Sequence, residues 1–171
     1  IFFQNRSIAI FKNKLNNQPG GFALGSIEGR VAIQCLDAKD NKDNFTFKCH
    51  RSSELINGFQ EIYPSSRDFV GYKKIGVKVV VRVSTPIHQT LCTAGADGRY
   101  SFWDKDARTK LKGSDAMAMP ITACHIHQGG NIMAYSIGYD WSKGSEYSYP
   151  TNVTKIYLHA CNEEMKPRVK K

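Results

Sequence analysis

The fold is decided by residues 93–111, which read TAGADGRYSFWDKDARTKL. This pattern predicts two antiparallel strands joined at Asp97-Gly98, because an Asp-Gly pair suits the two positive φ angles of a type I′ hairpin turn. After the turn, residues 99–103 form a half-buried, aromatic-rich alternation typical of a strand. Phe102 and Trp103 are adjacent and must face opposite sides of that strand, so we expect one of them to lie in the core.

Short apolar alternations recur along the whole chain, whereas helical periodicity is hard to find. They predict strands at 7–11, 21–27, 30–36, 45–50, 77–83, 121–126, 131–137 and 154–160. Residues 89–104 also align with residues 20–35, so that Glu28-Gly29-Arg30 matches Asp97-Gly98-Arg99. Four antiparallel strands that recur as a unit are typical of a β-propeller blade, although a β-sandwich uses similar short strands.

We therefore predict an all-β fold in which the whole chain, residues 1–171, forms part of a β-propeller. The expected blades span about 7–51, 61–113 and 120–161. The segment at 65–76 exceeds what the blade repeat needs, and we interpret it as a surface loop. The basic tail at 162–171 is expected to fray.

The formal charge of +9 favours an acidic partner, which could be nucleic acid, an anionic surface or a Glu-rich protein segment. Five widely spaced cysteines without a Cys-x-x-Cys pair argue against a disulfide scaffold or a structural zinc site and favour a reducing compartment. The opening apolar run is too short for a signal peptide or a membrane span. We expect a soluble protein without membrane insertion, and a piece of something longer.

Signals for catalysis are weak. Residues 124–127, CHIH, place two histidines on one face of a strand, but no third metal ligand is apparent. The sequence contains no nucleophile elbow, no Gly-rich phosphate loop and no His-Glu-x-x-His motif. We predict that the protein is not an enzyme and uses no cofactor or metal.

Basic residues recur at the tips of the predicted blades. Arg30 follows the Glu28-Gly29 turn, and Lys48, His50 and Arg51 close the next strand. In an up-and-down blade these two positions share one rim, where an arginine can hold a carboxylate or a phosphate in a bidentate fork. A solvated charged turn is the alternative reading.

A second candidate is the long loop that contains Tyr139, Asp140, Trp141 and Lys143. A tryptophan in such a long loop is not required to fill the hydrophobic core. Aromatic and cationic residues together are common at protein interfaces and on single-stranded nucleic-acid platforms.

Several stretches closely resemble the C-terminal part of the WD-repeat mRNA export factors of the nuclear pore. They are GFALGSIEGRVAI, NFTFKCHR, DGRYSFWDKDARTKLK, NIMAYSIGYDWSKG and the closing EEMKPR. The related mitotic-checkpoint propeller shares SIEGRVA and FKCHR, but not FWDKDARTKL or YDWSKG. Against this family pattern, roughly a dozen residues around 65–76 are extra.

The resemblance implies about three C-terminal blades of a seven-bladed ring, with the outer strand of the last blade missing. It implies a non-enzymatic adaptor in mRNA export that binds the GLEBS motif, an acidic segment of an FG-repeat nucleoporin, on the top face. Arg30 corresponds to the arginine that meets this segment. Glu28, Lys48, His50, Arg51 and the Tyr139 loop join the candidate set.

The resemblance also implies residence in the nucleus, the nuclear envelope and the cytoplasm, with RNA or mitotic spindle proteins as further partners. Direct RNA binding through the basic surface is the alternative function, and a mitotic-checkpoint adaptor is another.

Overall fold

The computed structural model describes residues 5–13, 16–36, 43–56, 59–62, 80–83 and 89–167, with the backbone alone at 52–56, 59–62 and 80–83. The predicted loop at 65–76 and the beginning of the predicted strand at 77–83 lie outside these residues.

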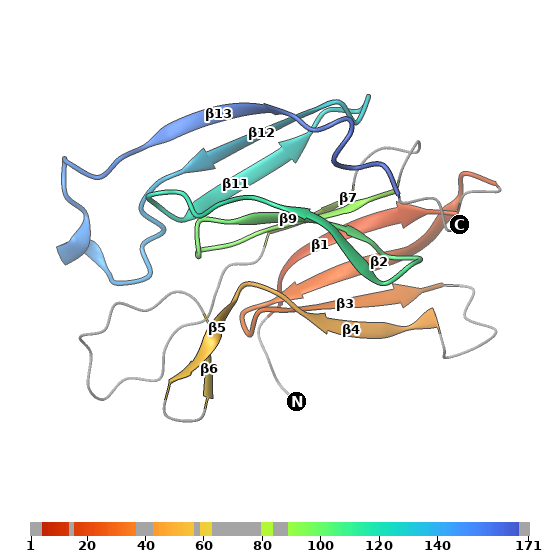
Figure 1. Cartoon of the computed structure of the whole chain (residues 1–171), viewed down its shortest axis with the longest axis horizontal. Coiled ribbons are helices and arrows are strands. Elements are labelled where there is room, and N and C mark those ends of the chain that lie inside the picture. The colour runs from red at the N-terminus through yellow and green to blue at the C-terminus, as the bar shows by residue number, and fades with distance from the viewer. Residues whose placement is uncertain are drawn as a thin grey trace.

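Antiparallel sheets make up the described part of the chain (Figure 1). The first sheet has the order β1 (Asn5–Lys12), β2 (Pro19–Ser26), β3 (Arg30–Cys35), β4 (Phe45–Lys48). The second has the order β7 (Val80–Val83), β8 (Leu91–Ala94), β9 (Tyr100–Asp104), β10 (Thr109–Gly113). The third contains β11 (Ile121–Ile126), β12 (Ile132–Ile137) and β13 (Lys155–Ala160). Within each sheet, strands follow chain order, as in a propeller blade.

Period-two alternation is visible in the burial of these strands. Along β2, Gly21, Ala23 and Gly25 are buried, while the residues between them are half-buried. Alternate side chains of a strand face opposite sides of the sheet, so a sheet packed between neighbours needs apolar residues on both faces. The all-β prediction is confirmed, and most predicted strands agree with the structure to within two residues at each end.

Two apolar clusters join the sheets. Val31, Ile33 and Leu91 belong to the cluster between the first and second sheets. Phe102 and Met133 belong to the cluster between the second and third sheets, and both are fully buried. Phe102 is thus the core member of the Phe102-Trp103 pair, as expected for one of the two. Each sheet depends on its neighbour for one apolar face.

The predicted type I′ turn at Asp97-Gly98 is wrong. Only Gly98 has a positive φ, at 69°. The two strands are joined by a longer loop, closed by hydrogen bonds from the Gly95 N–H to the Arg99 carbonyl (3.0 Å) and from the Gly98 N–H to the Gly95 carbonyl (3.2 Å). The Asp97 carboxylate also accepts the Arg99 N–H at 3.1 Å, so this aspartate shapes the loop through its side chain.

The expectation that the tail frays is wrong for residues 162–167. The Met165 side chain is fully buried in the cluster between the second and third sheets. Its carbonyl accepts a 2.6 Å hydrogen bond from the Thr90 hydroxyl, and the Cys161 N–H donates to the Asn131 carbonyl at 2.9 Å. One buried methionine therefore anchors this turn against the sheets.

The strand pattern did not predict the hairpin of β5 (Arg51–Ile56) and β6 (Phe59–Ile62), which pair in a sheet of their own. It also did not predict the short 3-10 helix η2 (Ser145–Tyr147) in the β12–β13 loop. Among the described residues, no helix has the length and apolarity needed to cross a membrane.

Both terminal sheets expose apolar side chains on their outward faces. Ile8 and Ile10 of β1 are more than half exposed, and Ile156 and Leu158 of β13 are almost four-fifths exposed. The third sheet has three described strands where the first two have four. This matches the missing outer strand that the family resemblance implies.

Candidate functional site

The β2–β3 turn presents Arg30. Gly29 has a φ of 62°, and a Cβ at that position would lie 2.5 Å from the Cys49 carbonyl oxygen, so only glycine fits. The Cys49 N–H donates to the Gly29 carbonyl at 2.9 Å, which ties the turn to the segment after β4. Arg30 pairs directly with Lys48 across β3 and β4. The backbone under both cations is therefore fixed.

The Arg30 side chain is 44% exposed, and its Nε lies 3.8 Å from the Glu28 carboxylate. A contact of this length, with the arginine largely in solvent, contributes little and leaves most of the guanidinium donors available. Glu28 and Arg30 thus stand side by side on the turn.

Arg51 braces the same turn. Its Nη2 donates to the Glu28 carbonyl at 2.7 Å, and its Nε donates to the Gly29 carbonyl at 3.4 Å. Desolvation lowers the pKa of Arg51, and the positive charge of nearby Arg30 lowers it further. Two like charges held this close favour an anion between or beside them.

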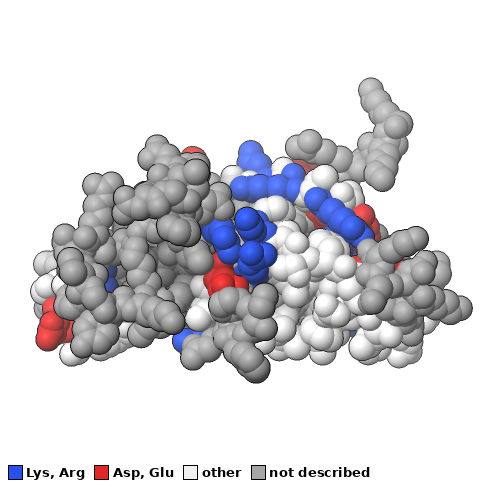
Figure 2. All heavy atoms as spheres, turned by 90° about the horizontal axis from the view of Figure 1, so that it is seen from below, with Lys and Arg blue, Asp and Glu red and all other residues white. Residues whose placement is uncertain are grey.

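A cavity of about 320 Å³ opens beside these residues, and we call it the basic groove. Its cations are Lys48, Arg51, Arg99 and Lys110, and its acid is Asp97. Lys and Arg side chains also gather near the middle of the molecular face in Figure 2. No described acid forms an ion pair with Lys48 or Lys110, so the cationic character of the groove is not neutralised within this part of the chain.

His50 points into the protein. It is buried, and its Nδ1 lies 2.9 and 3.0 Å from the two Asp97 carboxylate oxygens. Its Nε2 lies 2.9 Å from the Thr93 hydroxyl, which also accepts the Trp103 indole N–H at 2.9 Å. A ring with its proton on Nδ1 satisfies every donor and acceptor in this chain of contacts.

Both ring nitrogens of His50 are thus occupied within the chain. A Cβ on Gly95 would lie 2.6 Å from His50 Nδ1, so the neighbouring loop has no room for a larger residue there. His50 was a candidate binding residue in the sequence, but the structure places it in the connection between the first two sheets. Sequence reasoning missed the roles of Thr93 and Asp97. The one available signal was Trp103, whose indole N–H needs an acceptor when the ring packs.

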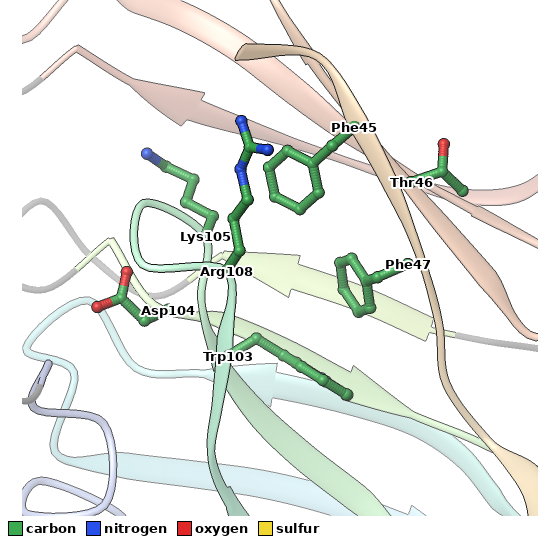
Figure 3. Close-up of a pocket in the computed structure, with 7 residues that line it drawn as sticks. All are labelled: Phe45, Thr46, Phe47, Trp103, Asp104, Lys105 and Arg108. Carbon is green, nitrogen blue, oxygen red and sulfur yellow. The ribbon is translucent and has the colours of Figure 1, made fainter. Parts of the chain in front are cut away.

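A second cavity, of about 290 Å³, lies between the first two sheets, and we call it the aromatic pocket (Figure 3). Its wall consists of Phe45, Phe47 and Trp103, with the Phe47 and Trp103 ring centroids 4.7 Å apart. Lys105 and Arg108 also line it, and the Arg108 guanidinium lies 4.6 Å from the Phe45 ring centroid. Trp103 lines both cavities, so the aromatic pocket and the basic groove are neighbours.

The sequence analysis did not find this pocket. The signal was the Phe-x-Phe spacing at 45–47, because alternate residues of a strand share one face. The sequence did not indicate that β9 and the turn after it would place Trp103, Lys105 and Arg108 opposite those two rings.

The Tyr139 loop connects β12 and β13. Tyr139 and Asp140 are half-buried, whereas Trp141 and Lys143 are exposed. In Figure 1 this loop, the β2–β3 turn and the β8–β9 turn all lie at the left-hand end of their sheets. The described residues contain no cluster of three or more His, Cys, Asp and Glu side chains that could hold a metal ion.

No protein-family model matches the chain. Two solved structures share its fold. The Pan2 WD40 domain of Neurospora crassa has a TM-score of 0.52 at 9% identity and matches 95% of this chain and 38% of that one. Chaetomium thermophilum Raptor has a TM-score of 0.52 at 13% identity and matches 79% of this chain and 10% of that one. The three larger sheets are blades of a WD40-type β-propeller, and the chain is a partial propeller.

Sequence relatives are much closer. The mRNA export factor rae-1 of Caenorhabditis elegans is 54% identical over 166 residues, which is 97% of this chain and 40% of that protein. The mRNA export factor of Xenopus tropicalis is 52% identical over 169 residues, 98% and 42% of the two chains. Protein Rae1 of Drosophila melanogaster is 48% identical over 167 residues, 98% and 44%. The chain is a homologue of the mRNA export factors, and it spans 40–44% of the length of these relatives.

Proposed function

We propose that this chain is part of a non-enzymatic adaptor for mRNA export, which binds the acidic GLEBS segment of an FG-repeat nucleoporin. The observation that carries the proposal is Arg30. Its guanidinium is exposed on a turn with a fixed backbone, next to Lys48 and Arg51. The names of the relatives support a role in mRNA export. With that role we propose residence in the nucleus, at the nuclear pore and in the cytoplasm.

Recognition would work by exchange of one carboxylate for another. Glu28 is a distant partner for Arg30, so an incoming carboxylate can form the bidentate fork that Glu28 does not form. Arg51 already holds the turn through two backbone carbonyls, and its charge adds to the field at Arg30. A partner with several acids would relieve the repulsion between the two arginines.

The test measures binding of a synthetic GLEBS peptide to the protein and to its Arg30→Ala variant by calorimetry. We expect the variant to bind about 10- to 100-fold more weakly, the usual effect of losing a charged hydrogen-bonded pair. Lys166→Ala is the matched control, because Lys166 lies in the turn after β13, close to the β11–β12 end of the third sheet. An unchanged dissociation constant for Arg30→Ala would remove Arg30 from the site.

A second candidate function, direct RNA binding, is favoured by the aromatic pocket and the basic groove, which share Trp103. The half-buried rings of Phe45 and Phe47 could stack bases, while the exposed Lys48 and Lys110 contact phosphates. Binding should be largely indifferent to sequence, and each lysine removed should lower the salt slope by about 0.7.

A single-stranded oligonucleotide titrated at several salt concentrations tests this candidate. Phe47→Leu retains an apolar packing group but removes the π-face, and should weaken binding to every sequence by about 1–3 kcal/mol. A flat salt response, or equal binding by Phe47→Leu, would exclude RNA from this groove.

A further inference from the structure

The β12–β13 loop exposes a large aromatic ring on an unfavourable backbone. Trp141 is 62% exposed, and its φ is 61°. Bulky residues rarely adopt this left-handed conformation, and an exposed tryptophan contributes little to the core. Neither local preference nor packing within the chain therefore accounts for Trp141.

The loop is braced by its own residues. The Tyr139 hydroxyl donates to the Gly144 carbonyl at 2.7 Å and accepts the Lys143 N–H at 3.1 Å. The Asp140 carboxylate accepts the Ser142 N–H at 3.1 Å, and the Gly144 N–H donates to the Trp141 carbonyl at 3.2 Å. The backbone around Trp141 is thus fixed before any partner arrives.

One side of the Trp141 ring contacts Tyr139. The two ring centroids are 5.8 Å apart and the planes are tilted by 44°. Most of the remaining ring surface faces solvent. A preorganised, exposed tryptophan is the residue type that most often anchors a protein partner, because it buries a large apolar area with little loss of side-chain entropy.

The position of the β12–β13 loop indicates that a segment bound at Arg30 can also reach Trp141. The β12–β13 loop in the third sheet corresponds to the β2–β3 turn with Arg30 in the first, and the β8–β9 turn with Arg99 lies between them (Figure 1). A segment that lies along this end of the sheets meets Arg30, then Arg99, then the Trp141 ring. Acidic residues suit the first two positions, and a bulky apolar residue suits the last.

We propose that Trp141 is the apolar anchor of the same acidic peptide segment that Arg30 binds. This inference rests on the proposed function and adds a second, chemically different contact to it. The segment places a bulky apolar side chain on the open face of Trp141, while its carboxylates bind Arg30 and Arg99. Tyr139 and Asp140 are positioning residues, since their polar groups hold the loop.

The test uses the GLEBS peptide and the variant Trp141→Gly. Glycine suits a φ of 61°, so this variant removes the ring without adding backbone strain, and its melting temperature should equal or exceed that of the wild type. We expect about 30-fold weaker peptide binding, the level of an interface hot spot. This loss should persist at high salt, whereas the loss in Arg30→Ala should shrink.

A spectroscopic readout separates contact from a structural effect. The chain has two tryptophans. Acrylamide quenching of the Trp141 signal, obtained as the difference between wild type and Trp141→Phe, should fall when the peptide binds. Tyr149→Ala is the matched control, because Tyr149 is an exposed aromatic residue of the same loop and should bind like the wild type.

Each result decides between the two proposals. Arg30-dependent binding with an unchanged Trp141→Gly affinity and unchanged quenching overturns the anchor and leaves the proposed function in place. Absence of peptide binding to the wild type overturns both. An equal loss in Tyr149→Ala overturns the assignment to Trp141.

Discussion

The Thr93→Val substitution tests whether the His50 contacts hold the first two sheets together. Thr93 is fully buried, and its hydroxyl meets both His50 Nε2 and the Trp103 indole N–H at 2.9 Å. Valine has nearly the same shape, so packing is retained while both polar partners lose their contact.

The expected cost follows from those two lost contacts. A buried polar group without a partner costs about 1–3 kcal/mol. The His50 side chain is only 2% exposed and should incur most of this penalty, whereas half-buried Trp103 can recover part of it from water. We expect a loss of about 2–4 kcal/mol in the free energy of unfolding.

Urea denaturation measures this loss as a shift in midpoint at constant m-value. The matched control is Thr122→Val, because the Thr122 hydroxyl is half-buried and meets the Ser136 hydroxyl at 2.9 Å. That substitution should cost less than about 1 kcal/mol. A double variant combines Trp103→Phe with Thr93→Val. In this variant the indole N–H is absent and cannot be left without an acceptor.

The double variant should therefore lose less stability than the sum of the two single variants. Our reasoning would be refuted by a Thr93→Val loss no larger than that of the control, or by strict additivity in the double variant.

Three further predictions concern burial and backbone geometry. Burial, reinforced by Asp97, raises the pKa of Cys49 from 9.0 to about 12. The native state keeps a proton that the unfolded state releases, so stability should fall between pH 9 and 12 by about 1.4 kcal/mol per pH unit, and Cys49→Ala should reduce this slope in urea titrations. Met165→Ala should cost about 2–4 kcal/mol in thermal denaturation, and a loss below about 1 kcal/mol would show that the turn after β13 is not anchored. Gly98→Ala places a Cβ 2.8 Å from a backbone oxygen at a φ of 69°, whereas the nearest atom to such a Cβ at Gly138 is 3.5 Å away. The first should lower the melting temperature more than Gly138→Ala, and equal effects would contradict the proposed strain.

Strands were predictable because sheets packed on both faces impose an alternation that each strand carries in its own residues. β11 was predicted with its observed bounds, Ile121–Ile126, from the pattern ITACHI alone. Turn geometry was less predictable. The Asp97-Gly98 pair suggested a two-residue turn, but the Asp97 carboxylate interacts with His50, which follows the last strand of the preceding sheet.

The candidate site shows the same limit. The place of Arg30 beside a tight turn could be predicted because that turn is local and its sequence recurs in the next blade. The aromatic pocket could not, because Phe45 and Trp103 meet only when two sheets pack. Met165 was assigned to a fraying tail for the same reason, since nothing near it in the sequence indicates the cavity that it fills.

The His50 contacts have a consequence for how such proteins can be cut and recombined. His50 follows β4 of the first sheet, yet its partners Thr93 and Asp97 belong to the second, as does Trp103, which bonds the same Thr93 hydroxyl. A boundary drawn after His50, such as the predicted end of the first blade at about residue 51, would separate this histidine from its partners. The segment that can be duplicated or transplanted intact therefore starts before the first strand of its sheet, because it must include His50. Exchange of blades between relatives should succeed only when His50 is transferred together with the strands that follow it.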